Sequence, residues 1–314
     1  MGRVPRASNR RRVDQAKLEA AGQKRLFGPP AQPITGRRRI SGVEKPIWTE
    51  NKANLIERYL YYFVQITKHG SYIDGFAGPQ RVGPSNWSAK LVLESTPKWL
   101  RHFFLCELKN APYVSLERLR DSQPTVGKGK AARTIELFHG DFNEEVHKIL
   151  RSQHLTQKEA TFCLLDQRTF QCHWSTVETL ARHKRAGTKI ELFYFLAAAW
   201  FDRAFSGIKD SAILDRWWGR DDWKALRRRP DLERAQTMCD RMKTDLGYKY
   251  TSPYEIRSRK QGGRVMYYMI HASDHDEAPY LMTRAYNRAV YPKETGHQLK
   301  LLLNEVQAML PNDI

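Results

Sequence analysis

The chain has 314 residues, of which 41% are hydrophobic, and it carries a formal net charge of +19 at pH 7. No window of about 18 apolar residues occurs, so no segment is long enough to cross a membrane, and no apolar secretory leader is present. The four cysteines have neither CxxC spacing nor a zinc-ligand pattern, which predicts buried thiols, no structural metal, and a reducing, cytoplasmic compartment.

The first 45 residues predict a basic, disordered arm. They hold nine Arg and three Lys against three acidic residues, and they contain few large apolar groups. A net charge of +9 here, with a further +10 over the rest of the chain, attracts polyanions, so nucleic acid is the partner that the charge favours. The alternative is a basic surface that serves solubility or binds an acidic protein.

Residues 46–197 predict a core of alternating helices and strands. A helix over 48–68 has apolar residues at helical spacing. We expect strands at 71–74, 102–107, 134–139, 161–166 and 189–196, separated by helices at 88–96, 110–121, 143–152 and 174–185. This alternation implies right-handed crossovers, and therefore an α/β fold with a Rossmann-like, doubly wound, mostly parallel sheet.

The pattern changes after residue 197. Residues 198–250 are rich in Trp and in charge, and they predict a helical insertion or lid. Residues 251–314 return to the core, with strands at 252–258 and 264–272 and helices at about 278–288 and 294–309. The short turn between the two strands predicts an antiparallel hairpin. A parallel sheet with such a late antiparallel strand suggests a methyltransferase.

An acidic residue lies at or just after the end of each of the first four predicted strands, namely Asp74, Glu107, Asp141 and Asp166. The carboxyl ends of parallel strands share one edge of a sheet, and ligands bind there at the switch in strand order. The first acid is followed by a tight turn that contains Gly75, Phe76 and Gly78. Its glycines let the backbone approach a ligand closely, so the turn is predicted to shape a cofactor pocket.

These acids together fit S-adenosylmethionine. Asp74 is predicted to orient the amine of the methionine part, and Glu107 to hold the ribose hydroxyls. Asp141 and Phe142 are predicted to offer adenine a hydrogen bond and an apolar wall. Each acid alone could be a helix N-cap or a loop carboxylate, but their ordered series favours a site.

Other classes of nucleotide-binding protein fit less well. The sequence has no G-x-x-x-x-G-K-[ST] loop, which argues against an NTPase, and the turn after Asp74 lacks G-x-G-x-x-G, which argues against a dehydrogenase. The four acids could instead hold magnesium and cleave a phosphodiester. A metal-dependent nuclease is therefore an alternative, although it gives the glycines no purpose.

The sequence resembles the three-Cys-motif partner protein family over about residues 46–285. The resemblance is carried by Trp48 and Lys52, and by the segments 72–79, 104–107, 140–143, 164–170 and 267–273. It implies a fold similar to class I S-adenosylmethionine-dependent methyltransferases and a bacterial source. It also implies a partner with a three-cysteine motif that looks like an iron–sulfur enzyme.

Two positions depart from the family pattern. Many relatives have glycine where this chain has Gln80, which predicts a displaced cofactor loop. Many also have an Asp-Pro-aromatic-Gly loop, similar to the catalytic loop of amino-methyltransferases, where this chain reads Asp166-Gln167-Arg168. Asp166 is retained to face the acceptor, and Arg168 favours contact with a phosphate or carboxylate. These two residues are the catalytic candidates, and the altered loop argues against an amine acceptor.

Two further groups are candidates for substrate binding. His173 and Trp174 follow the fourth strand and could stack on a base or relay a proton, or could form a helix start with a core Trp. Arg227 and Arg228 lie near several tryptophans, as in single-strand binders, or belong to a helical unit whose tryptophans form its own core.

Three hypotheses follow. The first is a methyltransferase-like enzyme that binds S-adenosylmethionine, with a nucleic-acid acceptor suggested by the basic arm. The second is a non-catalytic module that binds a neighbouring three-cysteine iron–sulfur protein, which the changes at Gln80 and Arg168 favour. The third is the metal-dependent nuclease.

Overall fold

The computed structural model describes residues 52–80, 87–129, 132–197, 201–208, 210–258 and 264–290. All of them fall within one compact unit, Ala31–Lys293. The predicted basic arm and the helix predicted at 294–309 lie outside the described residues. Within these ranges every helix is too short or too polar to traverse a bilayer.

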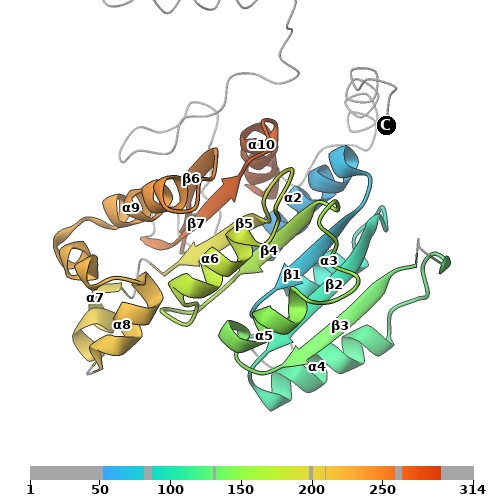
Figure 1. The fold of residues 1–314 in the computed structure, drawn as a ribbon, viewed down its shortest axis with the longest axis horizontal. Helices are drawn as coiled ribbons and strands as arrows, with labels where there is room; N and C mark the ends of the chain where they lie inside the picture. The colour runs from blue at the N-terminus through green and yellow to red at the C-terminus, as the bar shows by residue number, and fades with distance from the viewer. Residues whose placement is uncertain are drawn as a thin grey trace, which may run out of the picture. The chain divides into compact units, whose positions relative to one another are not determined.

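A seven-stranded sheet in the order β3-β2-β1-β4-β5-β7-β6 forms the centre of the fold (Figure 1). Its strands are β1 (Gly70–Asp74), β2 (Leu100–Glu107), β3 (Thr134–His139), β4 (Thr161–Leu165), β5 (Glu191–Leu196), β6 (Tyr250–Arg257) and β7 (Val265–Ser273). The pairs among β1 to β5 are parallel, and β7 runs antiparallel to both β5 and β6. The predicted doubly wound sheet with an antiparallel late strand is therefore confirmed.

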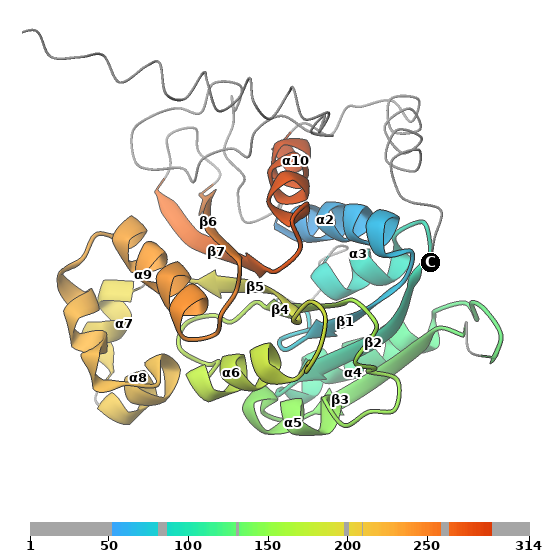
Figure 2. The ribbon, with the colours of Figure 1, turned by 45° about the horizontal axis from the view of Figure 1, so that its top comes forward.

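Helices cover both faces of this sheet (Figures 1 and 2). One face carries α2 (Lys52–Thr67), α3 (Ser88–Glu94), α4 (Asn110–Asp121) and α10 (Ala278–Val290). The other carries α5 (Phe142–Ile149), α6 (Trp174–Arg182), α7 (Phe201–Gly207), α8 (Ser211–Trp218), the 3₁₀ helix η4 (Asp221–Arg228) and α9 (Asp231–Thr244). The two layers give the protein two hydrophobic clusters, one on each side of the sheet.

Successive residues of the central strands alternate between these two clusters, because side chains along a strand point to opposite faces. On β5, Tyr194 packs with the α6 and α8 side, while Phe195 packs with the α2 and α10 side. Every residue of β5 is buried, which explains why its sequence is a nearly continuous apolar run. Pro253 lies in β6, at the sheet edge, where a missing backbone N–H is tolerated.

A buried polar cluster joins α2 to the sheet. The Tyr59 hydroxyl donates a hydrogen bond to the Glu191 carboxylate, which also contacts His271 Nε2 at 2.5 Å. All three residues are at most 6% exposed. Burial, followed by the neighbouring Glu191 charge, raises the pKa of Tyr59 well above its usual value. These contacts fix α2 against β5 and β7, and so fix the helix that begins with Lys52.

Gly219 joins the helical segment to the core. It ends α8 with φ of +77°, a left-handed conformation that favours glycine. A Cβ placed there would lie 2.7 Å from Cδ1 of Trp174. The contact couples the end of α8 to the first residue of α6.

We expect Gly219→Ala to lower the free energy of unfolding by about 3 kcal/mol, because backbone strain and overpacking add. Gly187→Ala is the matched control, since Gly187 has φ of +76° but nothing within 4 Å of a built Cβ. The control isolates the backbone term, which should cost about 1 kcal/mol. Urea unfolding of both variants measures the difference, and equal losses would contradict the steric contact.

Candidate functional site

The switch in strand order lies between β1 and β4. From β1 the chain proceeds outward to β2 and β3, whereas from β4 it proceeds outward to β5 on the opposite side. The Cα of Asp74 pairs with Leu164 on β4, so Asp166 follows two residues beyond that level. In doubly wound sheets the crevice beyond these strand ends is where ligands bind.

Asp74 is a buried carboxylate at this switch, with only 1% of its surface exposed. Its oxygens accept hydrogen bonds from the Tyr72 hydroxyl at 2.9 Å and from the Phe76 backbone N–H at 3.0 Å. The pKa of Asp74 is raised to about 7, chiefly by burial; the hydrogen bonds from Phe76 and Tyr72 oppose this rise, and the nearby charges of Asp166 and Glu107 add to it. Asp74 is therefore a buried acid that a cationic ligand would help to ionise.

The glycines of the following turn are required by the protein's own side chains. A Cβ on Gly75 would lie 2.8 Å from the ring of Phe142, and a Cβ on Gly78 would lie 2.5 Å from both Glu107 Oε2 and Pro112 Cβ. The turn is thus packed against the end of β2 and the first turns of α4 and α5. Sequence reasoning gave these glycines a role in approaching a ligand, and the structure adds this packing role.

Glu107 ends β2 and holds the turn from the neighbouring strand. Its carboxylate accepts hydrogen bonds from the Gly78 backbone N–H at 3.1 Å and from the Lys109 backbone N–H at 2.8 Å. The residue is half-buried, so the carboxylate also borders solvent. This is the position at which an acid commonly binds a ribose in doubly wound sheets.

Asp141 and Phe142 have local structural roles. Asp141 is exposed and is the N-cap of α5, where its carboxylate accepts from the backbone and side-chain amides of Asn143. Phe142 is buried, with its ring against Gly75 and 6.0 Å from the ring of Phe76. A helix N-cap was the alternative role predicted for each of the four acids, and Asp141 has this role. Phe142 forms the wall behind the turn.

Asp166 is buried and paired with Lys52, 114 residues earlier in the chain. The Lys52 ammonium lies 2.6 Å from each oxygen of the Asp166 carboxylate. Gln80 Nε2 approaches the same carboxylate at 3.5 Å. In the sequence, Lys52 is one of the residues that carry the family resemblance, but no role was predicted for its side chain. The available signal was its place three residues before Leu55 on the apolar side of the helix.

The segment after β4 is held by side-chain amides. The Gln167 side chain accepts from the Cys172 backbone N–H at 2.8 Å and donates to the Phe195 carbonyl at 3.4 Å. Asn143 Oδ1 accepts from the His173 backbone N–H at 2.8 Å, which ties α5 to the start of α6. The sequence places Gln167 in the altered loop and Asn143 in one of the segments that carry the resemblance, but it predicts no such tethering role for either residue.

Arg168 and His173 lie on this segment with different exposures. Arg168 is exposed, and its charge opposes the rise in pKa that burial and Asp166 cause at Tyr267, so Arg168 is near that ring. His173 is half-buried. Burial lowers the pKa of His173, and the neighbouring Arg216 lowers it further against the effect of Asp141. The charge of Arg168 therefore acts on Tyr267, and the charge of Asp141 acts on His173.

Trp174 and the tryptophans of the helical segment are packing residues. Trp174 is 4% exposed, and the Arg241 guanidinium lies 3.8 Å from its ring centroid and 4.3 Å from that of Trp218. The Trp174 ring is therefore enclosed by protein, as the core alternative had it. It is not presented to a nucleic-acid base.

Arg227 and Arg228 are both exposed on η4. The Arg227 guanidinium lies 5.1 Å from the ring centroid of Trp223 and 5.5 Å from that of Phe205. Trp223 is itself buried, and its indole N–H donates to Asp215 at 2.6 Å. The aromatic faces near these arginines are thus already covered, and only the cations are presented to solvent.

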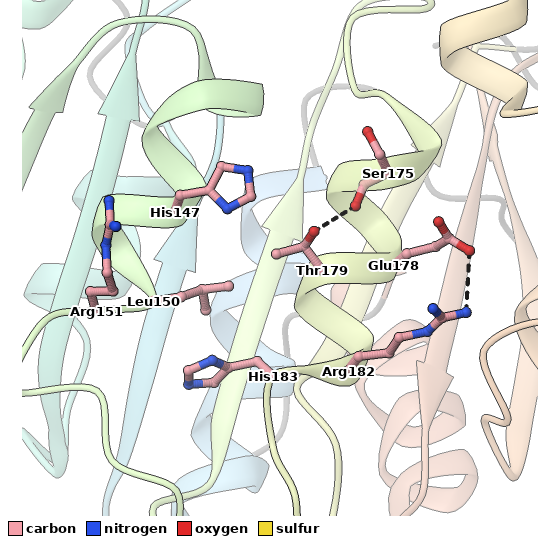
Figure 3. Close-up of a pocket in the computed structure, with 8 residues that line it drawn as sticks. All are labelled: His147, Leu150, Arg151, Ser175, Glu178, Thr179, Arg182 and His183. Atoms are coloured by element: carbon pink, nitrogen blue, oxygen red, sulfur yellow. Dashed lines mark hydrogen bonds and ion pairs between the residues drawn. The ribbon is translucent and has the colours of Figure 1, made fainter.

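A separate groove of about 640 Å³ lies between α5 and α6 (Figure 3). It is lined by His147, Leu150, Arg151, Ser175, Glu178, Thr179, Arg182 and His183. Arg182 pairs with Glu178 at 3.4 Å. Burial, then the adjacent Lys184, lowers the pKa of His183. The lining thus combines two arginines and two imidazoles with the Glu178 carboxylate.

The chain is similar to several solved structures at low sequence identity. No model of a protein family matches the chain, and no curated protein matches it. Trm1 from Pyrococcus horikoshii, solved with S-adenosyl-L-methionine, matches at 13% identity and a TM-score of 0.40 over 81% of this chain and 63% of that one. The CurJ carbon methyltransferase matches at 12% identity and a TM-score of 0.44, over 71% of this chain and 54% of that one.

A third solved structure, a protein of Listeria monocytogenes assigned to the class I S-adenosylmethionine-dependent methyltransferases, matches at 9% identity and a TM-score of 0.37. It covers 85% of this chain and 68% of that one. The chain therefore spans 63% and 54% of the lengths of the first two proteins. Identities and TM-scores of this size carry no activity from those proteins to this chain.

Proposed function

We propose that the protein is methyltransferase-like and binds S-adenosylmethionine at the carboxyl edge of β1, β2 and β4. The observation that carries the proposal is the buried Asp74 carboxylate at the strand-order switch, with Glu107 and Asp166 close enough to raise its pKa. Mutually repelling carboxylates of this kind favour a cationic ligand. S-adenosylmethionine brings both an ammonium and a sulfonium, so the donor set fits it.

Each residue has a proposed role in that site. Asp74 orients the ammonium from within the pocket, and Glu107 holds the ribose hydroxyls. Phe142 supports the turn from behind, and Asp141 lies at the adenine end. When bound, S-adenosylmethionine supplies an electrophilic methyl group. The protein contributes alignment of the acceptor, with Asp166 on the acceptor side and Arg168 at its rim.

Residues 198–250 are proposed to be a helical insertion or lid. The described helices α7, α8, η4 and α9 lie between β5 and β6 in the chain and pack on the α6 side of the sheet. The resemblance to three-Cys-motif partner proteins supports a bacterial, cytoplasmic setting. It also makes a three-cysteine iron–sulfur protein the protein partner to test.

Calorimetry with S-adenosylmethionine tests the proposal. We expect a dissociation constant below about 100 µM. Absence of binding, together with tight binding of a neighbour-encoded three-cysteine protein, would favour the non-catalytic module. Magnesium-dependent cleavage of DNA or RNA would favour the nuclease. Within the described ranges, no cluster of three or more His, Cys, Asp or Glu side chains is arranged to hold a metal ion.

Nucleic acid is the proposed polymeric partner, and the groove between α5 and α6 is where we expect it to bind. We expect the double variant Arg151→Glu and Arg182→Glu to bind nucleic acid at least about tenfold more weakly. The salt slope of log Kd should fall by about two, because each arginine that contacts a phosphate contributes about one. Fluorescence anisotropy at several salt concentrations measures both quantities.

The matched control is Arg118→Glu with Arg120→Glu on α4, which changes the net charge equally on the other face of the sheet. If the control lowers affinity and salt slope as much as the groove variant does, the net charge of the protein governs binding. The groove would then have no special role.

A further inference from the structure

The Lys52 ammonium occupies a compartment built as a receptor for a cation. Besides the Asp166 carboxylate, two aromatic rings face it, with Phe195 at 4.7 Å and Tyr267 at 5.2 Å from the nitrogen to the ring centroids. The two rings are 82° apart in orientation, so they form adjacent walls. A carboxylate with aromatic faces is the arrangement by which proteins recognise ammonium ligands.

Each wall of this compartment comes from a different element of the sheet edge. Asp166 follows β4, Phe195 lies on β5, Tyr267 lies on β7, and Lys52 enters from α2. Asp166 is near enough to Asp74 to raise its pKa, so the compartment adjoins the proposed cofactor site. Of the residues that contact this pair, Tyr267 is half-buried and Gln80 is exposed.

The lysine is the removable part of this arrangement. Phe195 is fully buried in the sheet, and Asp166 is continuous with β4, so neither can leave without disrupting the core. The lysine side chain is a flexible four-carbon stem that ends in an ammonium, and water hydrates this ammonium strongly. Withdrawing it would leave a carboxylate and two aromatic faces that require another cation.

We propose that Asp166, Phe195 and Tyr267 form a binding site for the amine of the acceptor, and that Lys52 closes this site from within when no acceptor is bound. The assignment of the amine as the acceptor's reacting group rests on the proposed function. The acceptor would bind as an ammonium, and Asp166 would have to take one of its protons before the nitrogen could bond to the methyl carbon. The bond from sulfur to that carbon would break at the same time, and S-adenosylhomocysteine would leave as a neutral thioether. The altered Asp166-Gln167-Arg168 loop argued against an amine acceptor at the sequence level. The structure instead offers an amine site whose aromatic walls come from β5 and β7.

Chemical rescue of Lys52→Ala tests the site without reference to activity. n-Propylammonium replaces the atoms that this substitution removes, so it should raise the melting temperature of Lys52→Ala by about 3 °C or more at tens of millimolar, in a saturable way. n-Propanol, the neutral analogue, should not do so. Lys52→Ala with Asp166→Asn should not respond to the ammonium. Equal shifts in the wild type, the single variant and the double variant would overturn the proposal.

A variant that fails to fold still gives an answer. If Lys52→Ala is recovered folded only when n-propylammonium is present during purification, the site is supported. If it stays insoluble with the ammonium while the double variant folds, the proposal is overturned.

Competition then distinguishes the acceptor's amine from the cofactor's own ammonium. For an acceptor site, the affinity of Lys52→Ala for n-propylammonium should stay within about twofold when S-adenosylhomocysteine is saturating, because both bind at once. A loss of more than tenfold would overturn the acceptor assignment. If S-adenosylhomocysteine does not bind at all, the proposed function fails, while the rescue result for the amine site stands.

Discussion

Replacing Asp74 by Asn is expected to weaken S-adenosylmethionine binding about 10- to 100-fold, which is the usual worth of one charge-assisted hydrogen bond. The amide keeps the size of the carboxylate and can still accept from the Phe76 backbone N–H, which Asp74 now binds at 3.0 Å. The turn should therefore stay folded. Calorimetry at pH 8, where the wild-type carboxylate is largely ionised, measures the loss.

The same carboxylate predicts a pH dependence of binding. The pKa of Asp74 is about 7, so in the unliganded protein the group is mostly neutral below that pH and must lose a proton to hold a cation. Affinity of the wild type should fall about tenfold between pH 8 and pH 6. The Asn variant, which has no such proton, should show no corresponding decrease.

Stability should change in the opposite direction. Because burial raises the folded pKa of Asp74 from 3.8 to about 7, the folded state binds the proton more tightly than the unfolded state does. The protonated Asp74 side chain therefore contributes to stability below about pH 4, and this contribution is lost as the pH rises to about 7. The free energy of unfolding should change by about 4 kcal/mol at most over this range. Asp74→Asn should therefore unfold at a higher temperature than the wild type at pH 8.

Weaker binding in a more stable protein separates a lost ligand contact from misfolding. Asp121→Asn is the matched control, since that carboxylate is exposed on α4 and should alter neither property. If Asp74→Asn binds S-adenosylmethionine as the wild type does, Asp74 has no part in the site.

Replacing Lys52 by Met is expected to lower the free energy of unfolding by about 3–5 kcal/mol, because it leaves the buried Asp166 carboxylate without a counter-charge. Met keeps the length and most of the apolar contacts of the lysine stem. The pair is 10% and 9% exposed at its side chains, so water cannot replace the lost ammonium. Urea unfolding near pH 7 measures the change.

The double variant Lys52→Met with Asp166→Asn should recover most of that loss, because neither charge then remains buried. Lys90→Met provides the control for a surface pair. Lys90 pairs with Glu94 one turn along α3, where both side chains are substantially exposed, and its loss should cost less than about 0.5 kcal/mol. A double variant no more stable than the single one would contradict the ion-pair explanation.

The strands and helices of this protein were predictable because their local signals agree with the tertiary packing. The apolar run of β5 is buried on both faces, and β6 and β7, which follow each other closely in the chain, form an antiparallel pair. The described elements begin and end within about three residues of the predicted bounds, apart from the first helix, whose predicted start lies outside the described residues. The differences arise partly where a helix is shorter than predicted. For example, α6 ends at Arg182, whereas its predicted end was residue 185.

In the site, the sequence predicted only the positions of residues at the ends of strands, because the ends of parallel strands share one edge of the sheet. Asp74, Glu107 and Asp166 follow from that rule. The pairing of Asp166 with Lys52 could not be predicted, because no local sequence pattern connects two residues that are 114 positions apart. Trp174 was ambiguous for a similar reason, since the residues that enclose it, Arg241 and Gly219, come from distant helices.

The position of β7 between β5 and β6 has a consequence for how the chain is made. Tyr194 pairs with Ile270, so during synthesis β5 must wait for some 75 further residues before its outer edge is covered. Until then a mostly apolar strand offers unpaired amides and carbonyls to any neighbour, a template for self-association. Nascent or truncated chains that stop before β7 should therefore depend on chaperones, whereas the completed chain protects this edge by itself.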